Sequence, residues 1–227
     1  MIQPDDVIAK IPKRTGLYHF AVLLASRYYL GLFIKNIKDE WYPVIGASNH
    51  GVSEAIYLED PDGNGIEVYR DVDQVKWDRD GDRIQMVTLP INYDELIEEA
   101  GEDNWGNAPL STRIGHIHLH VADLDKARKF YTDGLGFELT MEAGRSAIFI
   151  STGGYHHHIG LNVWNGRDAE SPPDNSVGMK YYTLQFPDDE SRQESIDRLR
   201  ELGYEIFEED QDVYVRDPSN NLIELKA

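Results

Sequence analysis

Histidines and strand carboxylates are the residues of this sequence whose types suit metal chemistry. The chain holds 8 histidines, and three of them stand side by side in GGYHHHIGLN, residues 153–162. Neutral imidazole and carboxylate both bind divalent transition metals, and two imidazoles with one carboxylate are typical of non-haem Fe(II) oxygenases. The sequence has no cysteine, so any metal ligands must be His, Asp or Glu.

Charge and composition limit the partners of the chain. Its 227 residues include 41 acidic and 22 basic ones, which gives a formal net charge of −19. Such a surface repels phosphate backbones and anionic lipids, so we expect no nucleic acid and no membrane as partner. No run reaches the ~20 apolar residues of a membrane span, and the N-terminus lacks the pattern of a signal peptide. We therefore expect a cytoplasmic location.

A repeated stretch anchors the organisation of the chain. Residues 56–67 read IYLEDPDGNGIE and residues 213–224 read VYVRDPSNNLIE. Asp-Pro followed by Gly or Asn is turn chemistry, so each copy predicts strand, tight turn, strand. In the alignment of the two copies, Tyr57 corresponds to Tyr214 and Glu67 corresponds to Glu224. Both glutamates face away from the neighbouring isoleucines because side chains alternate along a strand.

A longer unit surrounds each of these repeats. Strict alternation from His116 to Val121 predicts a strand, and Asp123 is placed to cap the helix that follows. Further strands at 145–151 and 156–164 complete a βαβββ unit, which we also find over residues 17–70 and 179–227. The expected fold is α+β with repeated βαβββ modules. Residues 71–111 read as a connection with one short helix at 93–100.

These stretches carry a family resemblance. GHIHLHVADLDKARKFYTDGLGF and the two Asp-Pro segments resemble the vicinal-oxygen-chelate superfamily, which includes glyoxalases, bleomycin-resistance proteins and extradiol dioxygenases. TGLYHFAVLL, VSEAIYLEDPDGNGIE and GGYHHHIGLN look most like bacterial catechol-2,3-dioxygenase-like members. The resemblance implies that paired modules curl into a cleft-forming mixed sheet with helices on the outside.

The resemblance also predicts a domain organisation. In that family two modules make one compact domain, but we count three modules here. We expect residues 1–75 to form half of a first domain, 76–111 a linker, and 112–227 a complete second domain. The partner module of residues 1–75 is then missing, either because the chain is shortened, which we favour, or because another subunit replaces it. The uncovered half-domain would favour a homo-oligomer.

Strand alternation suggests a first metal site. If residues 156–164 form a strand, Ile159, Leu161 and Val163 face the helices, while His156 and His158 face the opposite side and His157 turns inward. The same parity puts His116 and Glu224 on the cleft side of their own strands. We therefore predict His116, His158 and Glu224 as ligands, with His156 beside them as a proton carrier.

The N-terminal module contains a second candidate metal site. His19 has cleft-facing parity, and Glu67 matches Glu224. The stretch from His50 to Glu67 resembles the extradiol dioxygenase pattern. That resemblance implies a metal-ligand role for Glu67, and roles for His50 and Tyr57 in handling substrate oxygen. We expect the third ligand to be missing together with the absent module.

The expected function is that of an extradiol, catechol 2,3-type dioxygenase acting on a small aromatic diol and O2. Fe(II) is the expected metal, with Mn(II), Zn(II) and Ni(II) as alternatives. His50 or His156 would transfer protons, and Tyr57 or Tyr181 would hydrogen-bond the substrate oxyanion. Two alternatives stay open: a glyoxalase-like metal-dependent lyase or isomerase, and a non-catalytic small-molecule-binding or resistance protein of the same fold.

Overall fold

The computed structural model describes residues 5–81 and 83–227, which divide into two compact units. One unit comprises His19–Ile117, and the other comprises residues 5–18 together with His118–Ala227. Within the described residues, no helix has the length and apolar character needed to cross a membrane. The predicted α+β class with repeated βαβββ modules is confirmed, while the domain boundaries predicted at 75 and 111 stay a prediction.

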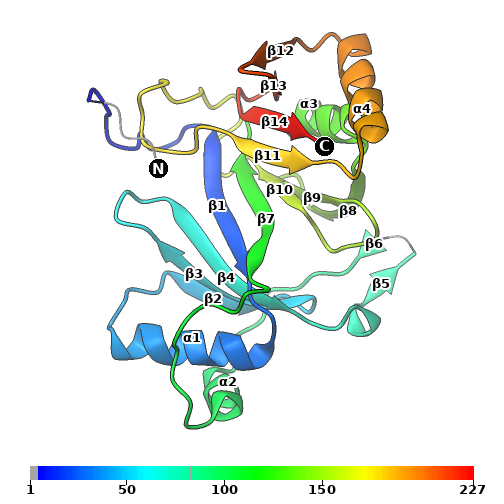
Figure 1. Cartoon of the computed structure of the whole chain (residues 1–227). Helices are drawn as coiled ribbons and strands as arrows, with labels where there is room; N and C mark the ends of the chain where they lie inside the picture. The colour runs from blue at the N-terminus through cyan, green and yellow to red at the C-terminus, as the bar shows by residue number, and fades with distance from the viewer. Residues whose placement is uncertain (1–4, 82) are drawn as a thin grey trace. The chain divides into compact units, whose positions relative to one another are not determined.

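The His19–Ile117 unit is built on strands of one sheet, in the order β2-β3-β4-β1-β7 (Figure 1). β1 pairs with β4 in parallel, and β3 pairs with β2 and β4 in antiparallel fashion. The boundary between the units falls within β1 and β7. A short hairpin, β5–β6, follows the 3₁₀ turn η1. The bounds are β1 Gly16–Leu23, β2 Gly46–Asn49, β3 Ser53–Glu59, β4 Gly65–Asp71, η1 Gln74–Lys76, β5 Arg79–Asp80, β6 Arg83–Ile84 and β7 Arg113–His120.

Two helices cover one face of this sheet. α1 (Arg27–Asp39) and α2 (Tyr93–Ala100) bury their apolar sides against the β3 and β4 residues Ile56, Leu58 and Val68 (Figure 1). α2 has the bounds that the sequence predicts, and its Leu96 is fully buried against α1. A Cβ at Gly31 would lie 2.1 Å from the Leu96 carbonyl oxygen, so only glycine permits this close approach. The candidate site lies on the opposite face of the sheet.

A buried carboxylate holds α1, β3 and β4 together. Glu54 on β3 accepts hydrogen bonds from Arg27 Nε on α1 and Arg70 Nε on β4, both at 2.8 Å. Arg27 also donates to Glu95 and Glu99 on α2. Burial acts to raise the pKa of Glu54, but the two guanidinium groups outweigh it and lower that pKa.

Glu54→Ala is therefore expected to lower the free energy of unfolding by roughly 2–4 kcal/mol, because it leaves two guanidinium groups without their shared partner. Glu95→Ala, which removes an exposed carboxylate from Arg27, should cost under about 1 kcal/mol. Since the pKa of Glu54 is lower in the folded chain, its contribution is present above an ordinary pKa of about 4.3 and is lost as the pH falls through the folded value. Urea unfolding between pH 3 and 7 measures both effects. Equal losses in the two variants would contradict this role.

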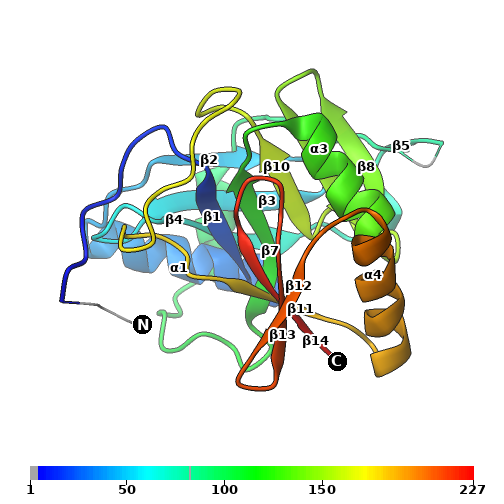
Figure 2. The same cartoon turned by 90° about the horizontal axis from the view of Figure 1, so that it is seen from above.

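The other unit contains two sheets and two helices (Figure 2). The end of β7 continues into the order β7-β10-β9-β8, and a second sheet has the order β11-β14-β13-β12. α3 ends in a π-helical turn, η2, and α4 packs against that turn where a Cβ at Gly134 would lie 2.6 Å from Leu199. The bounds are α3 Leu124–Lys129, η2 Phe130–Gly134, β8 Glu138–Ala143, β9 Ala147–Ser151, β10 Ile159–Asn162, β11 Tyr182–Gln185, α4 Asp189–Glu201, β12 Ile206–Glu209, β13 Asp212–Arg216 and β14 Leu222–Lys226.

The two Asp-Pro repeats adopt the same turn. In the first, Asp60 Oδ1 accepts from the backbone N–H of Asp62 and Asn64, and Asp60 Oδ2 accepts from the Asn64 side chain. In the second, Asp217 makes the same three bonds with Ser219 and Asn221. The sequence repeat is therefore a repeat of hydrogen bonds as well.

The strand predicted at residues 156–164 is shorter than expected. β10 covers Ile159–Asn162, so the three histidines lie in the connection between β9 and β10. All four residues of β10 are buried, so its two faces do not differ as they would in a half-buried strand. The predicted start of the strand at residue 156 is therefore wrong, and strand alternation does not apply to His156, His157 and His158. The side that each of them faces stays a prediction.

Candidate metal centre

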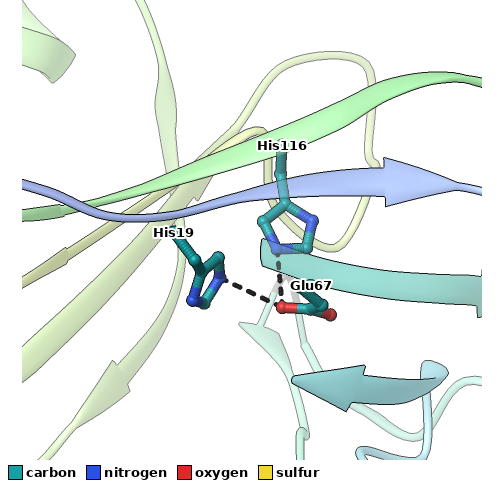
Figure 3. A group of neighbouring side chains, drawn as sticks. All are labelled: His19, Glu67 and His116. Carbon is teal, nitrogen blue, oxygen red and sulfur yellow. Dashed lines mark hydrogen bonds and ion pairs between the residues drawn. The ribbon is translucent and has the colours of Figure 1, made fainter. Parts of the chain in front are cut away.

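Three side chains that could hold a metal converge on one face of the sheet in the His19–Ile117 unit. His19 comes from β1, Glu67 from β4 and His116 from β7, and their ligand atoms all lie within 4.8 Å of one another (Figure 3). Glu67 Oε2 is 3.0 Å from His19 Nε2 and 3.2 Å from His116 Nε2. Among the described residues, this is the one such group of three or more.

Strand pairing explains why these residues meet. The parallel register of β1 and β4 sets Ala21 opposite Glu67, and His19 lies two residues before Ala21 on the same face. β7 lies next to β1 in the sheet order and presents His116. Exposure is 5% for His19, 3% for Glu67 and 4% for His116, so all three are removed from bulk water.

The ring of Tyr69 packs beside His116, and Gly115 leaves the space that this ring fills. Tyr69 lies on the same face of β4 as Glu67 and is fully buried, with its ring centroid 4.9 Å from that of His116. A Cβ at Gly115 would lie 1.9 Å from the Tyr69 hydroxyl oxygen. The missing side chain at residue 115 therefore makes room for the ring that contacts His116.

Gly115→Ala is expected to displace Tyr69 and His116 together, because a fully buried aromatic ring has no free space into which it can move. Overpacking of this kind costs about 1–3 kcal/mol, and we expect metal affinity to fall with it. Thermal unfolding and metal titration of the variant measure the two losses. Gly106→Ala serves as the control, since a Cβ there meets nothing within 4 Å and Gly106 does not have a positive φ. Unchanged metal affinity in Gly115→Ala would contradict this packing role.

The electrostatics favour an ionised carboxylate at the centre. Burial acts to raise the pKa of Glu67, but the nearby imidazoles of His116 and His19 outweigh it and hold the pKa well below its ordinary range. A buried anion with two imidazole nitrogens beside it is a ready ligand for a cation, because metal binding requires a deprotonated carboxylate.

The donor set fits a divalent transition metal. Two ligand atoms that each lie about 2.1 Å from one ion at a right angle are roughly 3 Å apart, and the contacts of Glu67 Oε2 with the two imidazole nitrogens have that separation. Two imidazoles and one carboxylate suit Fe(II), and leave coordination positions for further ligands.

A histidine and a tyrosine form a hydrogen-bonded pair in the same unit. His50 Nε2 lies 2.8 Å from the Tyr57 hydroxyl, and His50 Nδ1 lies 2.8 Å from the Val87 carbonyl oxygen. Tyr57 is opposite Glu67 in the β3–β4 register, and its ring centroid is 5.6 Å from that of His19. Tyr57 therefore lies next to two of the three candidate ligands. The roles in handling substrate oxygen that the resemblance implies for His50 and Tyr57 stay a prediction.

The other predicted site residues have other neighbours. His158 Nδ1 lies 2.8 Å from Ser151 Oγ. Burial lowers the pKa of His158, and the neighbouring imidazole of His156 lowers it further. His156 Nδ1 lies 2.7 Å from His157 Nδ1. Glu224 on β14 accepts a hydrogen bond from Thr183. Tyr181, named as an alternative to Tyr57, is 40% exposed.

The structure corrects one expectation about the N-terminal site. The sequence interpretation held that the third ligand for His19 and Glu67 would be missing, and this is wrong because His116 occupies that position. It had grouped His116 with His158 and Glu224, whereas the structure groups it with His19 and Glu67. A ligand role for any of these five residues stays a prediction. Sequence reasoning had missed Val87 and Tyr69, and no motif marks either residue.

Comparisons with known proteins agree with this fold. A family model described as the Glyoxalase/Bleomycin resistance protein/Dioxygenase superfamily matches residues 113–225. A Bacillus subtilis (strain 168) protein named catechol-2,3-dioxygenase is 47% identical over 218 residues, which are 95% of this chain and 76% of that protein.

Two solved structures share the fold at low sequence identity. Glyoxalase I of Zea mays superimposes with a TM-score of 0.54 at 18% identity, over 95% of this chain and 69% of that one. A provisionally assigned dioxygenase of Bacillus subtilis subsp. subtilis str. 168 superimposes with a TM-score of 0.57 at 15% identity. That match covers 96% of this chain and 63% of the solved chain, so the present chain spans less than two thirds of its length.

Proposed function

The chain belongs to the glyoxalase/bleomycin resistance protein/dioxygenase superfamily, and from this premise we propose that it is a metal-dependent extradiol dioxygenase of the catechol 2,3 type. The observation that carries the proposal is the convergence of His19, Glu67 and His116 next to the hydrogen-bonded pair of His50 and Tyr57. The name of the relative at 47% identity supports the same activity. The substrate would be a small aromatic diol, with O2 as second substrate.

We assign Fe(II) as the metal, held by His19 Nε2, Glu67 Oε2 and His116 Nε2. When bound, this ion would supply Lewis acidity toward the diol oxygens and open positions at which diol and O2 can meet. The three side chains come from three neighbouring strands of one sheet, which brings their ligand atoms together.

His50 and Tyr57 would handle the protons. With a neutral His50, the Tyr57 hydroxyl can donate to His50 Nε2 while its oxygen accepts from a substrate hydroxyl. Once a proton has passed from substrate to Tyr57 and from Tyr57 to Nε2, the protonated Nε2 donates to the Tyr57 oxygen, and the Tyr57 hydroxyl can then donate to the substrate oxygen that has become negative. Burial of the neighbouring side chains excludes water from one side of the site and strengthens these interactions.

The donor set favours this reaction over a glyoxalase-like one. Two imidazoles with one carboxylate are the set typical of Fe(II) oxygenases. The likeness to solved maize glyoxalase I is at 18% identity, and so concerns the fold. A non-catalytic binding protein of this fold would not need the His50–Tyr57 pair beside the ligands.

The test is anaerobic loading with Fe(II), followed by catechol and then O2, with the yellow ring-cleavage product followed by absorbance. We expect product that scales with bound iron. Mn(II), Zn(II) and Ni(II) loaded in parallel decide the metal. Full iron occupancy without product or oxygen uptake, for catechol and for alkyl-substituted catechols, would overturn the dioxygenase assignment.

A further inference from the structure

We propose that the segment from Gln85 to Leu89, which lies outside the βαβββ modules, positions His50 for proton transfer with Tyr57. Val87 is the positioning residue, and it acts through its backbone carbonyl. The inference rests on the proposed function and deepens it, since it states how the proton carrier of that site is set.

The hydrogen bonds of His50 fix which ring nitrogen carries the proton. A carbonyl oxygen can only accept, so the 2.8 Å contact between His50 Nδ1 and the Val87 oxygen requires a hydrogen on Nδ1. In a neutral ring, Nε2 is then left with its lone pair. Nε2 can therefore accept from the Tyr57 hydroxyl, which lies 2.8 Å away. The carbonyl selects the tautomer in which Nε2 can act as base.

The carbonyl of Val87 is itself held in place. Val87 N–H donates to the His50 carbonyl at 3.1 Å, so the two residues are linked through backbone and side chain. Leu89 and Asn49 exchange two backbone hydrogen bonds at 2.9 and 3.0 Å, and Ser48 Oγ donates to the Leu89 carbonyl at 3.3 Å. The segment is thus attached to the edge of β2 on both sides of the carbonyl that orients the imidazole.

The side chains of the segment from Gln85 to Leu89 do not account for its attachment to β2. Val87 and Leu89 are 43% and 54% exposed, so burial of their side chains does not account for the attachment. Gly51, with φ of +77°, lies in the turn between β2 and β3, directly after His50. A Cβ at Gly51 would lie 3.4 Å from a Val87 side-chain carbon, so the two segments are in contact there.

The experiment measures the tautomer of His50 directly. ¹⁵N NMR of the metal-free wild-type protein, with His50→Gln to assign the signals, should show the proton on Nδ1, whereas a free imidazole side chain prefers Nε2. Val87→Pro removes the N–H that holds the carbonyl. It should shift His50 toward a mixture of tautomers and lower kcat about tenfold, while KM changes little. Met86→Pro is the matched control, because the backbone N–H of Met86 is not part of this ladder and the substitution leaves the Val87–Thr88 amide unchanged.

The outcomes separate the two claims. A proton on Nε2 in the wild-type protein, or an unchanged tautomer in Val87→Pro, overturns the positioning role. If Val87→Pro does not fold, the wild-type tautomer decides alone. A proton on Nδ1 in a protein that takes up Fe(II) and forms no product supports the positioning of His50, and at the same time overturns the dioxygenase assignment. A fall in kcat in Met86→Pro equal to that in Val87→Pro would assign the effect to the strain of proline and count against the proposal.

Discussion

Glu67→Gln is expected to lower the affinity for Fe(II) by more than about 100-fold, because loss of a supporting contact to a ligand already costs 10–100-fold. The substitution keeps the shape of the side chain and removes its charge, which the two imidazoles of His19 and His116 surround. Ring cleavage should fall with iron content. Anaerobic titration with Fe(II), followed by metal analysis of the desalted protein, measures the loss.

Glu224→Gln is the matched control, since Glu224 occupies the equivalent position of the other Asp-Pro repeat. Its carboxylate accepts a hydrogen bond from Thr183 and lies 3.6 Å from Lys226 Nζ. We expect iron content and affinity within about twofold of the wild-type protein. A larger loss in Glu224→Gln than in Glu67→Gln would place the metal in the C-terminal repeat and contradict the candidate centre.

The second large effect is expected at the proton carriers. His50→Ala should lower kcat by about 10²–10⁴-fold, the usual contribution of general acid–base catalysis, with iron content unchanged. Tyr57→Phe keeps the ring against His19 and removes only the hydroxyl that His50 contacts, so we expect a loss of the same order. Steady-state oxygen uptake with catechol, normalised to bound iron, gives both values.

Double substitution tests whether the two residues act as a unit. His50→Ala with Tyr57→Phe should cost little more than either change alone, because each removes the same hydrogen-bonded path. His156→Ala and Tyr181→Phe, the alternatives from sequence, should leave kcat within about threefold, because the proposal assigns proton transfer to His50 and Tyr57. Additive losses at His50 and Tyr57 would contradict the relay.

Much of the fold could be predicted because it is encoded locally. Alternation in residues 116–121 predicts β7, the Asp123 side chain caps α3 through the N–H groups of Asp125 and Lys126, and both Asp-Pro repeats form the same turn. Each of these signals lies within a few residues of the element that it predicts. The short helix at 93–100 was found for the same reason.

The site could be predicted only in part. Parity identified His19, Glu67 and His116 as residues on the inner face of their strands, but it does not say which strands become neighbours. The placement of β7 beside β1 is a long-range choice that no local pattern contains, and it changed the expected partner of His116. The strand prediction for His156, His157 and His158 was wrong for another reason. The sequence HHHIGLN predicts a strand from its first residue, whereas the pairing of β10 with β9 begins at Ile159.

His50 shows a further limit. The resemblance pointed to His50 and Tyr57, and their 2.8 Å contact fits that role. The carbonyl that sets the imidazole belongs to Val87, 37 residues further along the chain. A backbone group carries no side-chain signal, so only the folded chain reveals the contact.

The most direct test of the central claim is the iron content of His116→Ala compared with that of His158→Ala after anaerobic loading. If the centre consists of His19, Glu67 and His116, the first variant retains almost no iron after desalting and the second binds as much as the wild-type protein. Full iron in His116→Ala, with loss in His158→Ala, would contradict it.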